Sequence, residues 1–113
     1  ANYENRCAVS GINISKLLIA SHIIPWADNA KERLNPENGI CLSPLYDKAF
    51  EDGFIAIDNK YKILVSKRFE KEIDDACFER FFKPYMGTGI NLPKKYLPGK
   101  KFLEEHLEKI FLN

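Results

Sequence analysis

The chain has few cysteines and no long apolar runs. Its three cysteines among 113 residues, Cys7, Cys41 and Cys77, form an odd and scattered set, which argues against a disulfide framework. The longest apolar runs, such as residues 17–20 and 23–26, are far too short to cross a bilayer. The N-terminus also lacks the basic segment and apolar core of a secretory signal. We therefore expect a reducing, cytoplasmic setting and no membrane partner.

An excess of charge of one sign is absent as well. The 17 Lys and Arg residues nearly balance the 16 Asp and Glu residues, for a formal net charge of +1, so no global field marks a polyanionic partner. The hydrophobic content of 45% and charged content of 29% are typical of one ordinary globular domain, here residues 1–113. The sequence begins with Ala1 rather than methionine, from which we expect a fragment of a larger protein.

Local patterns in the first half predict two strands and a helix. The apolar stretch 17–24 predicts a strand, and residues 39–42 predict a second strand after a long polar loop. Ser43 and Pro44 predict the start of a helix, because the serine side chain can cap the free amides and proline suits the first helical position. Gly53 predicts the end of that helix.

The second half predicts a hairpin followed by helices. Residues 54–57 and 61–65 alternate around a three-residue turn, which is typical of a hairpin. Apolar spacing predicts one helix over residues 69–82, and the segment 86–100, rich in Gly and Pro, predicts a loop. A closing amphipathic helix is predicted from an apolar face made by Phe102, Leu103, Leu107, Ile110 and Phe111. This order of elements predicts an α+β domain.

The chain has two histidines, and we interpret them differently. His22 stands near the end of the first predicted strand, where it could be a hydrogen-bonded structural residue or a general base. His106 lies on the closing helix among glutamates, so we predict a surface or interface residue.

Two acids on the predicted central helix suggest a metal site. Asp47 and Glu51 are four residues apart and therefore share a face. Oxygen ligands of this kind suit Mg²⁺, Mn²⁺ or Ca²⁺. The alternative is a solvated acidic face with Lys48 and Asp52 around it. Asn38, which precedes a glycine, is by itself ordinary turn chemistry.

Together and in this order, these features resemble a known motif. The segments "ASHIIPW" and "NPENGICLSPLYDKAFEDG" resemble the HNH nuclease motif of the ββα-metal fold. The resemblance implies that His22 is the general base, Asn38 the central asparagine, and Asp47 the third position, which is usually histidine. Glu51 falls in the tail of the motif, where Asp is usual. The implied ββα-metal core spans about residues 17–53, with the hairpin and C-terminal helices added to it.

The resemblance extends beyond the motif. The segments "CAVSGI", "GFIAID", "ILVS" and "FLEEHLEKIF" look like a subgroup of HNH domains found at the C-terminal end of modular restriction-type nucleases. This resemblance implies a bacterial or phage protein, an upstream recognition domain in the full-length chain, and double-stranded DNA as the partner. A homodimer would allow both strands to be cut.

The chain departs from the family at two sets of metal ligands. Ser21 stands where an acid or histidine often binds the catalytic metal, and a hydroxyl is a weak ligand. Asp47 therefore becomes the principal expected ligand and Glu51 a secondary one, a hard oxygen set that favours Mg²⁺ or Mn²⁺ over Zn²⁺. The four positions of the structural zinc site in many HNH domains fall on Cys7, Ser10, Ser43 and Tyr46. One thiol cannot hold zinc, so we expect no structural zinc, and an apolar cluster of Cys7, Tyr46 and Phe50 in its place.

The resemblance implies a mechanism and its alternatives. His22 would deprotonate a water that attacks the scissile phosphorus, a metal held by Asp47 would stabilise the developing charge, and Asn38 would hold the loop that orients the imidazole. Lys31, Arg33 and Lys48 would contact DNA phosphates without reading sequence, and residues 94–101 could add contacts. The alternatives are a catalytically inactive HNH-like module that binds nucleic acid or protein, and a globular domain whose motif is coincidental.

Overall fold

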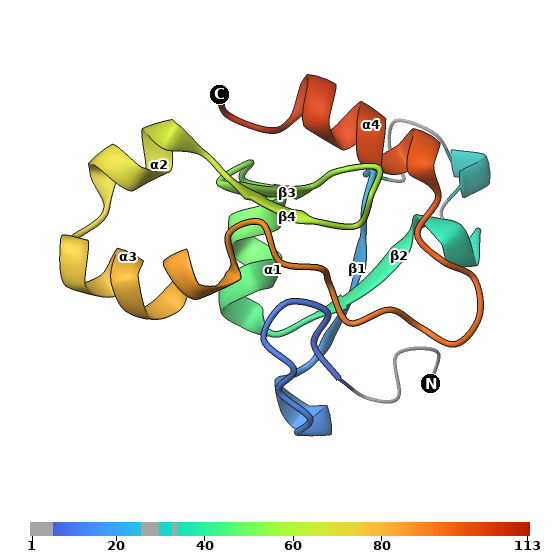
Figure 1. The fold of residues 1–113 in the computed structure, drawn as a ribbon. Helices are drawn as coiled ribbons and strands as arrows, with labels where there is room; N and C mark the ends of the chain where they lie inside the picture. Colours follow the sequence, from blue (N-terminus) through green and yellow to red (C-terminus); the bar gives the residue numbers. More distant parts are fainter. Residues whose placement is uncertain (1–5, 26–29, 33) are drawn as a thin grey trace.

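The computed structural model describes residues 6–25, 30–32 and 34–113. Arg33, expected to contact DNA, lies outside these residues. Figure 1 shows two small antiparallel sheets with helices packed around them. The strands are β1 (Ile19–His22), β2 (Gly39–Leu42), β3 (Ile55–Ile57) and β4 (Ile63–Val65). The α-helices are α1 (Pro44–Glu51), α2 (Lys67–Glu72), α3 (Asp75–Phe81) and α4 (Lys100–Lys109). The 3₁₀ turns are η1 (Ser15–Leu17), η2 (Ala30–Glu32), η3 (Pro36–Asn38) and η4 (Lys83–Tyr85).

The predicted ββα unit is present. β1 pairs antiparallel with β2, in a register that puts His22 opposite Gly39, and α1 follows β2 directly. β1 is shorter than the predicted strand 17–24, because η1 occupies its expected start. Within the expected polar loop, η2 and η3 form short turns. The fold is therefore a ββα unit with further α and β elements added to it, which is the arrangement that the resemblance implied.

The start of α1 differs from the prediction in one respect. Pro44 occupies the first helical position as expected, but the Ser43 side chain caps no amide. Its hydroxyl lies 3.6 Å from the Cys7 sulfur instead, because the N-terminal loop folds against this corner and provides a buried partner. The end of α1 is as predicted, with Gly53 just beyond it at a φ of 81°.

The second sheet is the predicted hairpin, β3 paired antiparallel with β4. Its turn is held by Asp58, whose carboxylate accepts hydrogen bonds from the amides of Lys60 (2.8 Å) and Lys62 (2.9 Å). Figure 1 shows α4 along one side of this hairpin and α1 along the other. The α1 helix also contacts β1 and β2, so one helix connects the two sheets.

The single helix predicted over residues 69–82 is wrong, because two helices, α2 and α3, occupy this region. Ser66 caps α2, and Asp74 caps α3 by accepting a hydrogen bond from the Cys77 amide at 3.3 Å. A well-placed aspartate begins a new helix and interrupts the old one. The apolar spacing spans both helices and so did not reveal the break.

The closing helix α4 is confirmed, but the prediction for His106 is wrong. Phe102 and Leu103 are buried as expected, whereas His106 is only 1% exposed. It occupies the apolar face three residues after Leu103, and the glutamates around it point elsewhere on the helix. The predicted loop 86–100 carries an isolated bridge from Gly89 to Lys62, and α4 begins at its last residue, Lys100.

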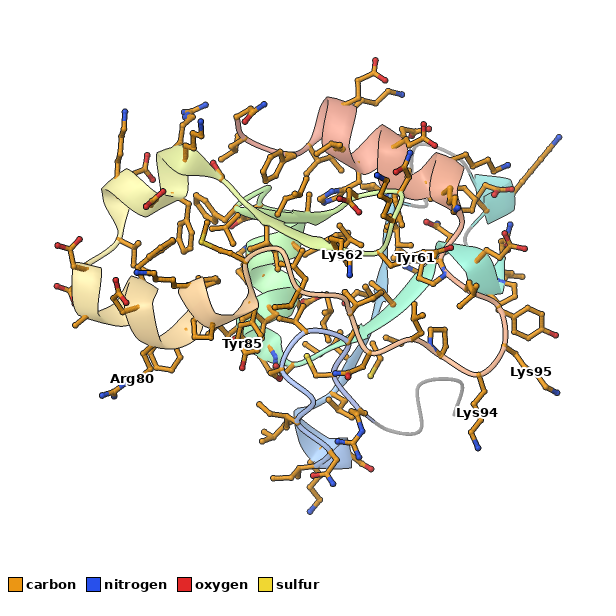
Figure 2. The ribbon with its side chains drawn as sticks, viewed as in Figure 1. Tyr61, Lys62, Arg80, Tyr85, Lys94 and Lys95 are labelled. Carbon is orange, nitrogen blue, oxygen red and sulfur yellow. The ribbon has the colours of Figure 1, made fainter. Side chains whose placement is uncertain are left out.

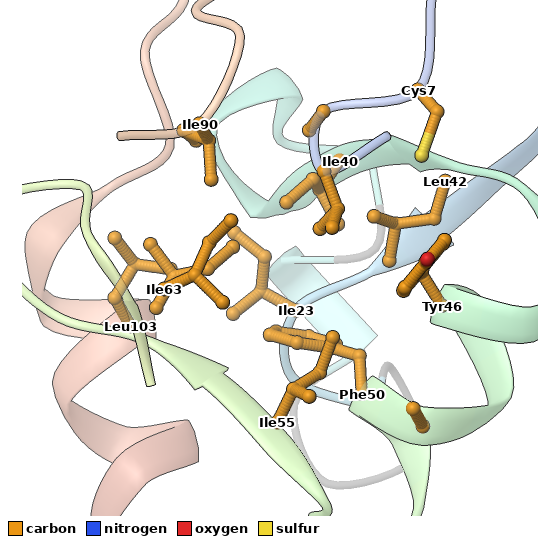
Figure 3. Close-up of a cluster of buried hydrophobic side chains, with 14 of the residues drawn as sticks. Cys7, Ile23, Ile40, Leu42, Tyr46, Phe50, Ile55, Ile63, Ile90 and Leu103 are labelled. Atoms are coloured by element: carbon orange, nitrogen blue, oxygen red, sulfur yellow. The ribbon is translucent and has the colours of Figure 1, made fainter. Parts of the chain in front are cut away.

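Buried apolar side chains from both sheets, α1 and α4 form one core (Figure 3). It includes Cys7, Tyr46 and Phe50, the cluster expected from the sequence. Phe50 is 2% exposed and anchors α1 to the sheets, so the core fixes where the polar face of α1 lies. Within the described ranges, no helix is both long and apolar enough to cross a membrane.

Candidate active site

An open cavity of about 290 Å³ lies between β1, α1 and α4. Its polar lining brings together four residues singled out from the sequence and one that was not. The four are Ser21, His22, Asp47 and Glu51, and the fifth is His106. The apolar part of the lining includes Phe50 and Ile110. The fold therefore brings together side chains that are up to 85 positions apart in the sequence, from Ser21 to His106.

His22 ends β1 at the rim of this cavity and is solvent-exposed. The backbone immediately after it is held to the second strand, because the Ile23 amide donates to the Asn38 carbonyl at 2.9 Å. An exposed imidazole at a fixed strand end can accept a proton from water or a substrate group in the cavity.

Asn38 fixes the chain next to His22 from inside the fold. It is 0% exposed, so it cannot touch a substrate. Its side-chain oxygen accepts from the Ile24 amide at 2.9 Å, and its side-chain nitrogen donates to the Ile24 carbonyl at 3.1 Å and to the Glu32 carbonyl at 3.3 Å. These bonds join β1, β2 and the loop between them, which is the geometry that its expected role requires.

Ser21 and Asp47 meet in the cavity. The Ser21 hydroxyl donates a hydrogen bond to Oδ1 of Asp47, so one oxygen from β1 and one from α1 converge. Asp47 lies in the first turn of α1, where the helix dipole stabilises a carboxylate. Glu51 is the last residue of α1 and exposed.

This donor set fits a hard divalent cation. In the described part of the chain, no three His, Cys, Asp or Glu side chains are grouped to hold a metal ion. The paired oxygens of Ser21 and Asp47 would therefore supply the protein ligands, and water or phosphate the others. Mg²⁺ is commonly bound in this way, through one or two carboxylates with several waters retained.

Of the basic residues expected to contact DNA, the two that the structure describes, Lys31 and Lys48, are not part of the cavity lining. Lys48 forms an ion pair with Asp52 at 3.4 Å, and its side chain is 68% exposed. Lys31 is exposed on η2. Lys94 and Lys95 extend from the loop before α4 (Figure 2). These side chains are positioned for contacts outside the cavity rather than for chemistry within it.

His106 is the cavity residue that the sequence interpretation missed. Its Nε2 lies 2.8 Å from the Phe50 carbonyl oxygen, and its ring stacks on the Phe50 ring at a centroid distance of 3.8 Å and an angle of 6°. Burial lowers the pKa of His106, and the hydrogen bond to Phe50 opposes this only in part. Its spacing from Leu103 was the available signal, because it places His106 on the apolar face of α4.

Of the four positions that the resemblance assigns to a structural zinc site, Cys7, Ser10 and Ser43 come together. The Cys7 sulfur accepts hydrogen bonds from the Ser10 amide at 3.4 Å and the Ser43 amide at 3.3 Å, while the Tyr46 hydroxyl donates to the Phe81 carbonyl at 2.7 Å. Burial raises the pKa of Cys7, but the hydrogen bonds from Ser10 and Ser43 more than offset it and the net shift is downward. With one thiol, this donor set does not fit zinc.

Comparison with known proteins agrees with this geometry. Residues 7–58 match the family model described as HNH endonuclease, whereas comparison with curated proteins gives no match. The matched segment contains β1, β2, α1 and β3, with His22, Asn38 and Asp47, and excludes α4 with His106. Residues 7–58, which carry the ββα unit, are therefore similar to HNH endonucleases.

Proposed function

We propose that this domain is a metal-dependent endonuclease that hydrolyses phosphodiester bonds in double-stranded DNA. The observation that supports the proposal most is the meeting of His22, Ser21 and Asp47 at one open cavity inside the segment that matches HNH endonucleases. This similarity favours nuclease activity, and the cavity supplies the side chains that such a reaction needs.

In the proposed reaction, each of these residues would have a distinct role. His22 takes a proton from the attacking water, since imidazole is suited to this role near neutral pH. Asn38 keeps the end of β1 in place through its bonds to Ile24. Asp47 and Ser21 would hold Mg²⁺ or Mn²⁺, with Glu51 acting through water. When bound, this cation stabilises the negative charge that develops on the phosphate.

Substrate contact would come from outside the cavity. Lysines such as Lys31 and Lys48 would bind phosphates and position DNA without reading its sequence. We infer that recognition belongs to an upstream domain of a cytoplasmic restriction-type enzyme, with this domain as its cleavage module. Pairing of two copies would place one cavity on each DNA strand.

Plasmid cleavage with controlled metal content tests the proposal. Supercoiled plasmid is incubated with the domain in Mg²⁺, in Mn²⁺ and in EDTA, and nicked and linear forms are separated by electrophoresis. We expect cleavage with either metal and none in EDTA, because the charge on the phosphate would then lack its cation. Binding of DNA without cleavage under every metal condition would instead identify the catalytically inactive module.

A further inference from the structure

The C-terminal helix α4 supplies the active-site cavity with a residue from outside the family match. His106 lines the same cavity as His22 and Asp47, yet the match ends at residue 58. Nothing in the proposed chemistry uses this histidine. Buried titratable side chains are rare, and one that lies beside a candidate active site often has a role there. The hydrogen bond of His106 indicates what that role is.

The hydrogen bond of His106 defines its tautomer. A backbone carbonyl can only accept, so the 2.8 Å contact to the Phe50 oxygen requires a proton on Nε2. Nδ1 has no hydrogen-bond partner among the described residues. In the neutral tautomer, that nitrogen carries a lone pair and leaves no buried N–H unpaired. The neutral imidazole with its proton on Nε2 therefore satisfies the hydrogen bonding at this position.

The contact acts on α1, the helix that carries both carboxylates. Phe50 directly precedes Glu51 and follows Asp47 by three residues. Parallel stacking of the two rings adds a second restraint at the same residue. Together, the bond and the stack fix both the backbone and the side chain of Phe50.

The segment after α4 holds the same end of α1. The Leu112 amide donates to the Gly53 carbonyl at 2.9 Å. A Cβ on Gly53 would lie 2.1 Å from the Ile110 carbonyl oxygen, which shows how closely the two segments approach. The C-terminal region thus contacts the end of α1 on both sides of Glu51.

We propose that His106 is a positioning residue of the active site. By holding the Phe50 carbonyl, it fixes α1 against α4, and with the helix it fixes the direction of the Asp47 and Glu51 carboxylates. The inference rests on the proposed function, because positioning matters only if these carboxylates hold a metal. In other metal sites, mutation of residues that orient the metal ligands typically lowers metal affinity or activity by about 10- to 100-fold.

Three variants separate positioning from stability. His106→Leu removes the donor, and His106→Gln keeps an amide N–H within reach of the Phe50 carbonyl. Phe102→Leu is the matched control, because Phe102 is buried on the same helix but is not part of the cavity lining. Mn²⁺ affinity is measured by calorimetry, and kcat and KM by plasmid cleavage.

We expect His106→Leu to weaken Mn²⁺ binding and lower kcat, each by about tenfold, the lower end of the range for groups behind metal ligands. KM for DNA should not change, since His106 is buried and cannot touch DNA. His106→Gln should recover most of the loss, and Phe102→Leu should lower the melting temperature without weakening Mn²⁺ binding. If the leucine variant fails to fold, His106→Asn replaces it, because the shorter amide cannot reach Phe50.

Two results would overturn the inference. One is wild-type Mn²⁺ affinity in His106→Leu, and the other is equal impairment of the leucine, glutamine and Phe102→Leu variants. If the wild type neither binds Mn²⁺ nor cuts DNA, the proposed function fails separately. The inference is then decided by NMR, where unchanged Asp47 and Glu51 carboxyl shifts in His106→Leu would refute positioning.

Discussion

The two histidines show how differently this fold uses the same side chain. His22 is exposed at the end of β1, where it can exchange protons with solvent. His106 is 1% exposed and donates its ring proton to a backbone carbonyl. Exposure suits the first for acid–base chemistry, and burial suits the second for holding α1.

His22→Ala should abolish cleavage and leave the fold intact. The side chain is exposed, so its removal opens no cavity in the core. Loss of a general base typically slows a reaction by about 10²- to 10⁴-fold. Plasmid cleavage measures the rate, and circular dichroism measures the fold. A variant that cuts at nearly the wild-type rate would eliminate His22 as the base.

Asp47→Ala should lose metal-dependent cleavage while its melting temperature stays within a few degrees of wild type. Asp47 is half-buried with the Ser21 hydroxyl as its partner, and truncation leaves that hydroxyl near the open cavity, where water can replace the carboxylate. Cleavage is titrated with Mn²⁺ and Mg²⁺.

Two further substitutions serve as controls for Asp47. Asp47→His restores the usual motif residue and should retain activity, accepting softer metals such as Ni²⁺. Glu51→Ala should have the milder effect, because Glu51 lies at the exposed end of α1. Unchanged metal dependence in Asp47→Ala would contradict the assignment.

At the scale of elements, Cys7 joins the N-terminal loop to the start of α1. Its sulfur is 0% exposed and accepts bonds from both Ser10 and Ser43. This cluster of hydrogen bonds lies at positions that the resemblance assigns to a structural zinc site, and it connects the N-terminal loop to the residue before α1.

Cys7→Ala should destabilise the domain by about 1–3 kcal/mol, because it leaves buried donors of Ser43 without an acceptor. Urea unfolding measures the loss, with the exposed Cys77→Ala as the control. Elemental analysis of the wild type should find no stoichiometric zinc. One tightly held zinc ion per chain would show that other ligands complete a site around Cys7.

At the scale of the whole molecule, burial of His106 links stability to pH. Because burial lowers its pKa below the ordinary 6.5, the unfolded chain binds a proton at this position more readily than the folded chain. Stability therefore rises with pH between the folded and unfolded pKa values. The contribution is fully present above about 6.5 and is lost as the pH falls through the folded value.

Urea unfolding at pH 7.5 and pH 5.5 tests this linkage. We expect wild type to lose more unfolding free energy between these two values than His106→Gln, which carries no titratable group there. Phe102→Leu is the control, because it changes the buried face of the same helix without removing a titratable group. An equal loss in wild type and His106→Gln would mean that His106 does not cause the pH dependence.

Much of the fold could be predicted from local pattern, and four of the five polar residues that line the cavity had been singled out from the sequence. Alternation predicted the β3–β4 hairpin, and Pro44 and Gly53 predicted the limits of α1, because strand period, first-turn proline and a left-handed glycine act over a few residues. The ββα unit that contains His22, Asn38 and Asp47 was implied by the resemblance of its segments to the HNH motif. The break between α2 and α3 was missed, since a continuous apolar spacing hid the cap at Asp74.

By itself, the sequence determined the ββα unit and the residues it carries, because their positions follow from short-range backbone preferences and from spacing within one motif. The tertiary structure alone decided the partners of the remaining groups. The Ser43 hydroxyl contacts Cys7, 36 positions away, and does not cap its own helix. The His106 ring contacts the Phe50 carbonyl, 56 positions away. A buried polar group bonds to whichever partner the packed core brings within hydrogen-bond distance. Contacts between residues far apart in the sequence leave no local sequence pattern from which they could be predicted.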